Sequence, residues 1–271
     1  AVFQGMNFIE AGRGRVVLVI GVEKMSDVDS ETLNRMLLKA AYLKEEGAVV
    51  NGFAGVFADI TQQYFACHGD QADAMAAIAA KNHHNGCANP WAQLRKDLGY
   101  DFCRMASDKN PMVAPPLRRT DCSLVSDGAA AVVLADLDTA KELPKAVRFR
   151  AAMQVNDLLP MSRRDMTTLD GCARAWHGAL GAARMVINDL DLVETHDCFT
   201  IAELMQYEAM GLTSVGRGAE AALDGWTQKS GRLPVNVSGG LKAKGHPIGA
   251  TGVSMHALVA MQLHAEAGDM Q

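Results

Sequence analysis

The sequence NVSGGLKAKGHPIGATG, residues 236–252, places one histidine among glycines directly before an apolar, Ala-rich segment. His246 precedes Pro247, whose ring restricts the loop, and residues 250 to about 267 are predicted to form a helix. Glycines allow a ligand to approach the main chain, and a helix N-terminus favours negative charge. The stretch therefore predicts a site where an imidazole and free backbone amides meet developing negative charge, as in acyl transfer to or from a thiol.

His196 is the second candidate for a chemical role. It ends a short apolar run, residues 192–196, ahead of a predicted helix over residues 201–210. Strand ends before helices are where α/β proteins place ligand-contacting groups, so the His196 N–H is a candidate donor to a thioester oxygen that becomes an oxyanion. Each histidine also has a structural interpretation. His246 would cap a glycine-rich turn, and His196 would pair with Asp197 or with the backbone.

Two short apolar runs, residues 15–22 and 129–135, predict central strands of one sheet that is covered on both faces. The segment between them is mainly helical, with helices predicted over residues 32–46 and 71–84 and separated by loops. Residues 85–116 are rich in Asn, Pro and Gly and are also predicted to be loop. Two strands of one sheet, interrupted by a helical insertion, are therefore expected.

A second α/β unit is predicted after Pro144. Residues 146–151 and 192–196 are expected to be strands, and apolar residues between Cys172 and Ile187 recur at helical spacing. Residues 1–11 are expected to be the end of a helix. The sequence thus predicts an α/β protein.

The composition excludes several function classes. Apolar residues make up 49% and charged residues 21% of the 271 positions, and the net charge of −5 offers no basic surface for nucleic acid or for an anionic membrane. No run of 18 apolar residues predicts a membrane span. Six cysteines without a CxxC pair indicate reduced thiols and a cytoplasmic protein rather than a disulfide framework or a zinc site. The first residues carry no initiating Met or signal, so the chain is expected to begin inside a domain.

The chain offers no convincing nucleophile for His246. Cys198 neighbours His196, but a cysteine at the start of a helix after a buried strand is more often a core residue than a nucleophile. The adjacent residues His83 and His84 point in different directions on a helix, so no metal site is predicted there. Residues 126–128, Ser-Asp-Gly, are predicted to be a turn.

Four motifs occur in the order and spacing of the thiolase superfamily: GVEKMS at 21–26, SDGAA at 126–130, HDCF at 196–199, and the loop at 236–252. The HDCF motif is similar to that of the bacterial and peroxisomal sterol-carrier-protein-type thiolases, where it replaces the Asn-Glu-Ala-Phe of other thiolases. The resemblance covers essentially the whole chain.

The resemblance implies an α/β thiolase fold of five layers, α-β-α-β-α, with two related halves. Residues 1–137 would be part of the N-terminal core, including a helical loop domain inserted at about 23–125 that covers the pantetheine of CoA. Residues 145–271 would be part of the C-terminal core. Family members are dimers or tetramers, so a homodimer or homotetramer is expected.

The resemblance also implies the roles of single residues. His246 matches the histidine that activates the nucleophilic cysteine, and His196 matches a position of the oxyanion hole. Gly240, Gly245 and Gly249 are expected to border bound CoA. The implied activity is that of an acyl-CoA:acetyl-CoA C-acyltransferase of lipid metabolism, which cleaves or forms 3-ketoacyl-CoA. CoA and acyl-CoA would be substrates, with no permanently bound cofactor.

The family pattern extends beyond the chain at both ends. The resemblance places the nucleophilic cysteine before Ala1 and the last two strands, with a possible second catalytic cysteine, after Gln271. An alternative is a thiolase-like CoA-ester-binding subunit, or a retro-aldolase component that pairs with a small OB-fold zinc protein. The intact loop around His246 argues against the aldolase. A third interpretation is an α/β domain that does not catalyse by itself.

Overall fold

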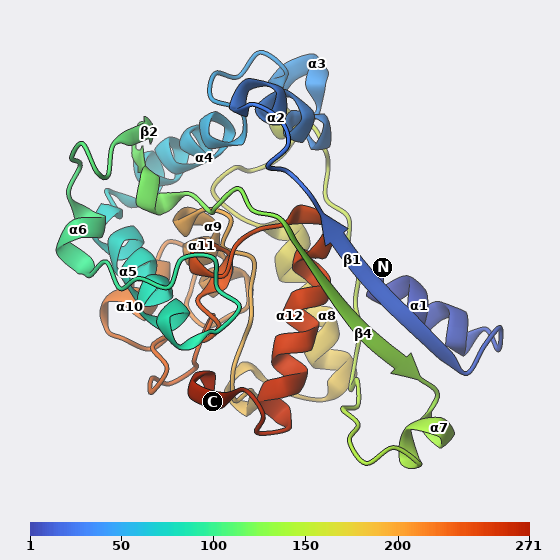
Figure 1. Ribbon diagram of the computed structural model, residues 1–271. Coiled ribbons are helices and arrows are strands. Elements are labelled where there is room, and N and C mark those ends of the chain that lie inside the picture. Colours follow the sequence, from blue (N-terminus) through green and yellow to red (C-terminus); the bar gives the residue numbers. More distant parts are fainter.

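An antiparallel ribbon of two strands, β1 (Val16–Glu23) and β4 (Gly128–Ala135), forms one side of the computed structural model, which describes residues 1–271 (Figure 1). Val16 pairs with Ala135 and Glu23 with Gly128, so every residue of each strand takes part. Apolar, β-branched side chains favour this pairing. The prediction that these two runs are neighbours in one sheet, despite the insertion between them, is confirmed.

Only one face of the ribbon is covered. Alternate side chains point to opposite faces of a strand, and Val19 and Leu134 face the helices α1 (Val2–Glu10) and α12 (Ile248–Leu263). The opposite face is apolar but more than half exposed at Val16, Leu18, Ile20, Val22 and Val133. The prediction of strands covered on both faces is therefore wrong, because no element of the structure lies over the second face.

Helix α12 meets the end of β1 at two glycines. A methyl group on Gly21 would lie 2.6 Å from the carbonyl oxygen of Gly249 and 2.8 Å from the Cα of Ala250. Real side-chain carbons do not approach so closely, so glycine at position 21 permits this contact. The close approach fixes the N-terminus of α12, and with it His246, beside the end of the ribbon.

The largest core lies among helices of the insertion and of the C-terminal half. Tyr64 of α4 (Phe53–His68) and Ile78 of α5 (Ala72–Ala88) pack with Leu204 of α9 (Thr200–Ala209), and all three are fully or almost fully buried. Helices at 71–84 and 201–210 were predicted within a few residues. Other helices and strands of the chain are β2 (Met112–Ala114), β3 (Leu117–Arg118), α6 (Tyr100–Arg104), α7 (Leu137–Lys141), α8 (Asp170–Ala183), α10 (Gly218–Leu223) and α11 (Gly240–Ala243).

Two helical predictions need correction. The helix predicted over 32–46 is broken into α2 (Ser30–Leu37), a short 3-10 turn and α3 (Leu43–Glu46). The extended conformation of Ala41 separates these pieces. Helix α4 occupies a stretch predicted to be loop.

The strands predicted for the second half are not formed as predicted. Residues 146–151 are irregular because no neighbouring strand pairs with their backbone groups. The side chains of Val147 and Phe149 are exposed. Residues 192–196 contribute a single parallel bridge, between Val193 and Val235. None of the helices combines the length and the apolar character needed to cross a bilayer.

Candidate active site

The structure brings His196 and His246 into contact. Their ring centroids are 4.9 Å apart and their planes meet at 84°, an edge-to-face arrangement. His196 follows the Val193 bridge, and His246 lies just before α12. Two segments that are distant in the sequence thus supply one pair of imidazoles.

Two hydrogen bonds hold His246 in place, and a third fixes the threonine that makes one of them. Its backbone N–H donates to Ser126 Oγ over 2.7 Å, which ties the loop to the segment that leads into β4. Its Nδ1 lies 2.7 Å from Thr251 Oγ1, and that hydroxyl lies 3.0 Å from the carbonyl oxygen of Pro247. Because Nδ1 is occupied and Nε2 has no hydrogen-bond partner in the chain, Nε2 is the ring nitrogen left for a substrate or a thiol.

Both imidazoles are neutral near pH 7. Burial, together with His196 and Lys244, lowers the pKa of His246 to about 3. The His196 side chain reaches the surface, yet surrounding protein atoms desolvate the ring, and with the charge of Lys244 this lowers the pKa of His196 to about 4. A neutral imidazole can both accept a proton and donate a hydrogen bond, so the pair contains a base and a donor at once.

Asp197 does not pair with His196 but turns into the protein. Its carboxylate accepts hydrogen bonds from the backbone N–H of Leu241, over 2.6 Å, and of Lys242, over 3.3 Å, at the start of α11. Burial and the nearby carboxylate of Glu203 raise the pKa of Asp197 above its ordinary value. Asp197 therefore anchors the glycine-rich loop from below and leaves the His196 ring free.

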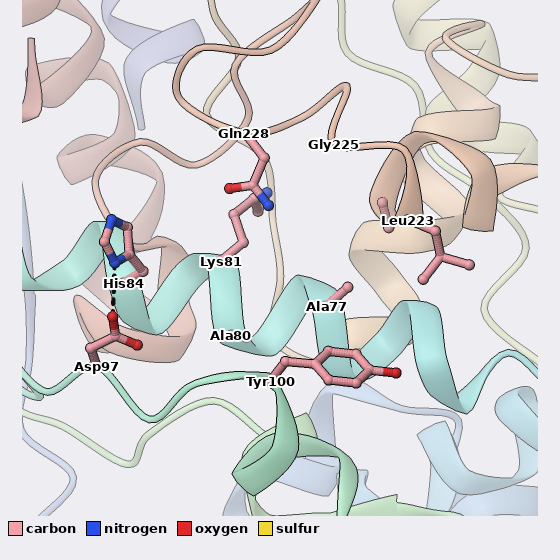
Figure 2. Close-up of a pocket in the computed structure, with 10 residues that line it drawn as sticks. Ala77, Ala80, Lys81, His84, Asp97, Tyr100, Leu223, Gly225 and Gln228 are labelled. Carbon is pink, nitrogen blue, oxygen red and sulfur yellow. Dashed lines mark hydrogen bonds and ion pairs between the residues drawn. The ribbon is translucent and has the colours of Figure 1, made fainter.

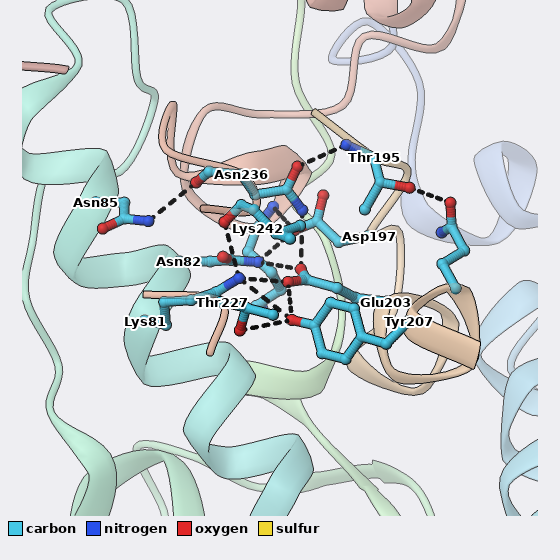
Figure 3. Close-up of polar contacts among 12 residues, drawn as sticks. Lys81, Asn82, Asn85, Thr195, Asp197, Glu203, Tyr207, Thr227, Asn236 and Lys242 are labelled. Carbon is cyan, nitrogen blue, oxygen red and sulfur yellow. Dashed lines mark hydrogen bonds and ion pairs between the residues drawn. The ribbon is translucent and has the colours of Figure 1, made fainter. Parts of the chain in front are cut away.

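A buried polar cluster supports both histidine segments (Figure 3). Lys81 Nζ donates to Glu203 Oε1 over 2.5 Å, and the side chains of this pair are 1% and 0% exposed. Asn236 donates to the other oxygen of Glu203 over 2.8 Å and accepts from the backbone N–H of Thr195 over 2.9 Å. Asn82 donates to both Glu203 and Asp197. The cluster thus joins α5 and α9 to the segments that carry His196 and His246.

Residues 153–271 match the family described as thiolase C-terminal domain-like. An acetyl-CoA acetyltransferase of Methanothermobacter thermautotrophicus is 36% identical over 273 residues, which cover 100% of this chain and 70% of that protein. This chain belongs to the thiolase family. Human sterol carrier protein 2 is 32% identical over 292 residues. This alignment covers 100% of the present chain and 51% of sterol carrier protein 2, so the chain spans about half of that protein.

Two solved structures share the thiolase fold. One, an Ltp2–ChsH2(DUF35) aldolase, superposes with a TM-score of 0.85 at 19% identity, over 99% of this chain and 70% of that chain. The other, a monomeric SCP2-thiolase-like protein type 1 from Mycobacterium smegmatis, gives a TM-score of 0.70 at 20% identity, over 98% of this chain and 53% of that chain. The predicted α/β thiolase fold is therefore confirmed.

The three glycines expected to border CoA all have close packing neighbours within the chain. Gly245, with φ of +109°, allows Ser126 to approach, since an added methyl would lie 2.8 Å from Ser126 Oγ. The backbone N–H of Gly249 donates to Glu23 over 3.2 Å at the end of β1. An added methyl on Gly240 would overlap the carboxylate of Asp197. Contact with CoA remains a prediction for all three.

We expect Gly240→Ala to lower the free energy of unfolding by about 2–4 kcal/mol, because the methyl meets Asp197 and the backbone has a φ of +56°. Gly12→Ala is the matched control, since Gly12 has a φ of +69° but nothing within 4 Å. Backbone strain alone should cost this control about 1–2 kcal/mol. Urea unfolding of both variants makes the measurement, and equal losses would contradict a role for the Asp197 contact.

Burial disfavours the thiolate form of four of the six cysteines. Burial raises the pKa of Cys198 well above its ordinary value and that of Cys122 to about 11. Burial also raises the pKa of Cys103 to about 11 and raises that of Cys172. Since the thiolate is the nucleophile, these buried thiols are poorly suited to serve His246.

The adjacent histidines of α5 face different surroundings. His83 is buried and neither ring nitrogen has a partner, whereas His84 pairs with Asp97 over 2.8 Å. No group of three His, Cys, Asp or Glu side chains is placed to hold a metal ion. His84 and Asp97 line a separate pocket of about 390 Å³ together with Lys81 and Tyr100 (Figure 2), and neither site histidine contributes to its walls.

Sequence reasoning missed several residues that position the site. Ser126 and Asp127 were predicted only as a turn, yet Ser126 holds His246, and Asp127 accepts from the backbone N–H of Met25 over 2.7 Å. Thr251 was within reach of local reasoning, because it follows Pro247 by one helical turn. Lys81 gave no local signal, because its partner Glu203 lies 122 residues away.

Proposed function

We propose that the protein is an acyl-CoA:acetyl-CoA C-acyltransferase, a thiolase that cleaves 3-ketoacyl-CoA or forms it by Claisen condensation. The observation that carries this proposal is the contact between two neutral imidazoles, His196 and His246. Acyl transfer through a thiol needs a base for the thiol proton and a donor for the carbonyl oxygen. The family membership supports the same chemistry.

In the proposed mechanism, His246 accepts the proton of a cysteine thiol at Nε2. The thiolate attacks the 3-keto carbon, and the oxygen of the keto group becomes an oxyanion. This tetrahedral intermediate collapses as the bond between C2 and C3 breaks. Acetyl-CoA leaves as its enolate and takes up the proton held by His246, and the acyl group remains on the cysteine. The thiol of CoA then gives its proton to His246, and its sulfur attacks the acyl-enzyme carbonyl. The acyl–cysteine bond breaks, the cysteine thiolate leaves and takes the proton back from His246, and the acyl group departs as acyl-CoA. His196 donates its N–H to the thioester oxygen that carries the charge.

The nucleophile is proposed to lie before Ala1. Val2 shares a buried cluster with Val19, Leu134 and Val253, and Gly5 lies against Leu134, Val19 and Val17 of the ribbon. Helix α1 runs along the ribbon toward the end where β1 begins, so the start of α1 is the part of this helix nearer to the start of α12 (Figure 1). A segment that enters α1 would come from the side of His246, which suits a cysteine served by that base.

A second candidate is a retro-aldolase component that binds CoA esters and partners a small OB-fold zinc protein. The contact between His196 and His246 also suits this candidate, because retro-aldol cleavage needs a base and an oxyanion donor but no cysteine. Here the base would take the proton of a 3-hydroxyl group, the bond between C2 and C3 would break, and acetyl-CoA would again leave as its enolate.

A trapping experiment separates the two candidates. The full-length protein is incubated with acetyl-CoA, quenched in acid and digested, and its peptides are weighed by mass spectrometry. We expect one cysteine peptide to carry an acetyl group that excess CoA removes. If no peptide is acetylated and 3-hydroxyacyl-CoA is cleaved instead, the thiolase proposal is wrong and the aldolase stands.

A further inference from the structure

The hydroxyl group of Thr251 sits between the ring of His246 and the first turn of α12. Its Oγ1 lies 2.7 Å from His246 Nδ1 and 3.0 Å from the carbonyl oxygen of Pro247. The residue is 4% exposed, so water has little access to compete for either contact. A threonine hydroxyl carries only one hydrogen, and its direction therefore decides which nitrogen of His246 is protonated.

The helix favours one direction. A carbonyl oxygen can only accept, so the contact with Pro247 requires the hydroxyl hydrogen to point there. Threonine hydroxyls in helices commonly donate to the carbonyl four residues earlier. The Pro247 carbonyl also accepts from the backbone N–H of Ala250 and of Thr251 itself. The hydroxyl then presents a lone pair to His246, and Nδ1 must be the protonated nitrogen.

We propose that Thr251 is a positioning residue that holds His246 as the tautomer protonated on Nδ1, with the lone pair on Nε2. This inference rests on the proposed role of His246 as the base, because a base needs that lone pair. It also removes a rearrangement from the cycle. When Nε2 accepts a proton, Nδ1 stays a donor and the contact with Thr251 is unchanged.

The opposite direction would give a different site. If the hydroxyl donated to Nδ1, the hydrogen of the neutral ring would sit on Nε2, and His246 would be an oxyanion donor rather than a base. The contact would then be lost whenever the ring became an imidazolium, since both nitrogens would carry hydrogens. The two directions thus predict different protonated nitrogens, which can be measured.

The test combines spectroscopy and kinetics on the full-length protein. Nitrogen-15 NMR of protein labelled at histidine distinguishes protonated from bare ring nitrogens, and the signals of His246 are those missing from His246→Gln. We expect Nδ1–H in the wild type and in Thr251→Ser, which keeps the hydroxyl. In Thr251→Val we expect a shift toward Nε2–H and a fall in kcat of about 10–100-fold with KM little changed.

Thr61→Val is the matched control. Thr61 is also a buried helical threonine whose hydroxyl donates to the carbonyl four residues earlier, in Phe57, over 2.6 Å, and not to a histidine. This variant should leave the His246 signals and kcat unchanged, which separates tautomer control from loss of a helix hydrogen bond.

Two results would overturn the inference. One is an Nε2–H signal for His246 in the wild type, which needs no variant to fold. The other is an unchanged tautomer and kcat in Thr251→Val. Failure of the proposed function is distinguishable from failure of this inference. If the protein forms no acyl-enzyme, the proposed function is wrong, but NMR still reports which nitrogen of His246 is protonated.

Discussion

His246→Ala is expected to lower the kcat of acetoacetyl-CoA thiolysis by about 10³-fold in the full-length protein, because the general base is removed. The residue fits this role since its Nδ1 is fixed by Thr251 while Nε2 has no partner. The measurement is the consumption of acetoacetyl-CoA, followed as the loss of the absorbance of its 3-ketoacyl thioester. Unchanged activity would show that another group accepts the thiol proton.

His256→Ala is the matched control for this substitution. His256 lies on the same helix, is exposed, and has its Nδ1 2.7 Å from the carbonyl oxygen of Gly252. We expect a change of less than about 2-fold, because surface substitutions away from the site have small effects.

The pH profile provides an independent check on the base. His246 must be neutral to accept a proton, so activity falls only as pH drops through its pKa, which burial lowers from 6.5 to about 3. The base form therefore persists well below pH 6.5. If activity instead fell as the pH dropped through about 6.5, and this fall were absent when His246 is replaced, His246 would titrate like an exposed histidine. That result would contradict the buried surroundings described above.

Lys81→Met is expected to lower the free energy of unfolding by about 3–5 kcal/mol, because it leaves the Glu203 carboxylate buried without its cation. The pair is almost completely buried, and Tyr207 also donates to Glu203 over 2.5 Å. Methionine keeps most of the volume, so the loss reports the charge rather than a cavity. Urea unfolding followed by circular dichroism makes the measurement.

Lys141→Met provides the comparison for an exposed pair. Lys141 and Asp138 are 3.2 Å apart, with side chains 63% and 80% exposed. Exposed pairs contribute about 0–1 kcal/mol. The double variant Lys81→Met with Glu203→Gln should recover part of the stability, because the uncompensated charge is removed. Similar losses for Lys81→Met and Lys141→Met would refute the argument from burial.

The parts of the fold that were predicted correctly are those with strong local patterns. The β-branched runs of β1 and β4 form strands that pair with each other, and the glycine-rich loop precedes a helix as expected. Helix α4 was missed because it begins after Gly52 without a side-chain cap. Its buried residues Val56 and Ile60 are nevertheless spaced by one helical turn. The apolar pattern of a helix was therefore present, but no capping residue marked where the helix begins.

The parts that were not predictable depend on distant partners. The uncovered face of the ribbon has the same alternating apolar residues as the covered one, and only the position of α1 and α12 separates the two. His196 and His246 were identified from their loops, but their contact with each other is a property of the folded chain. Ser126 and Lys81 were missed because their partners are remote in the sequence.

The pairing of β1 with β4 closes a very long loop. Lys24 and Asp127, which lie just beyond the paired residues and contact each other, are 103 residues apart. The entropy lost in closing a loop grows only with the logarithm of its length, and doubling that length costs about 0.6 kcal/mol. The insertion can therefore lengthen or shorten over evolution at little energetic cost to the ribbon. The contact of Gly21 in β1 with the start of α12 would stay intact.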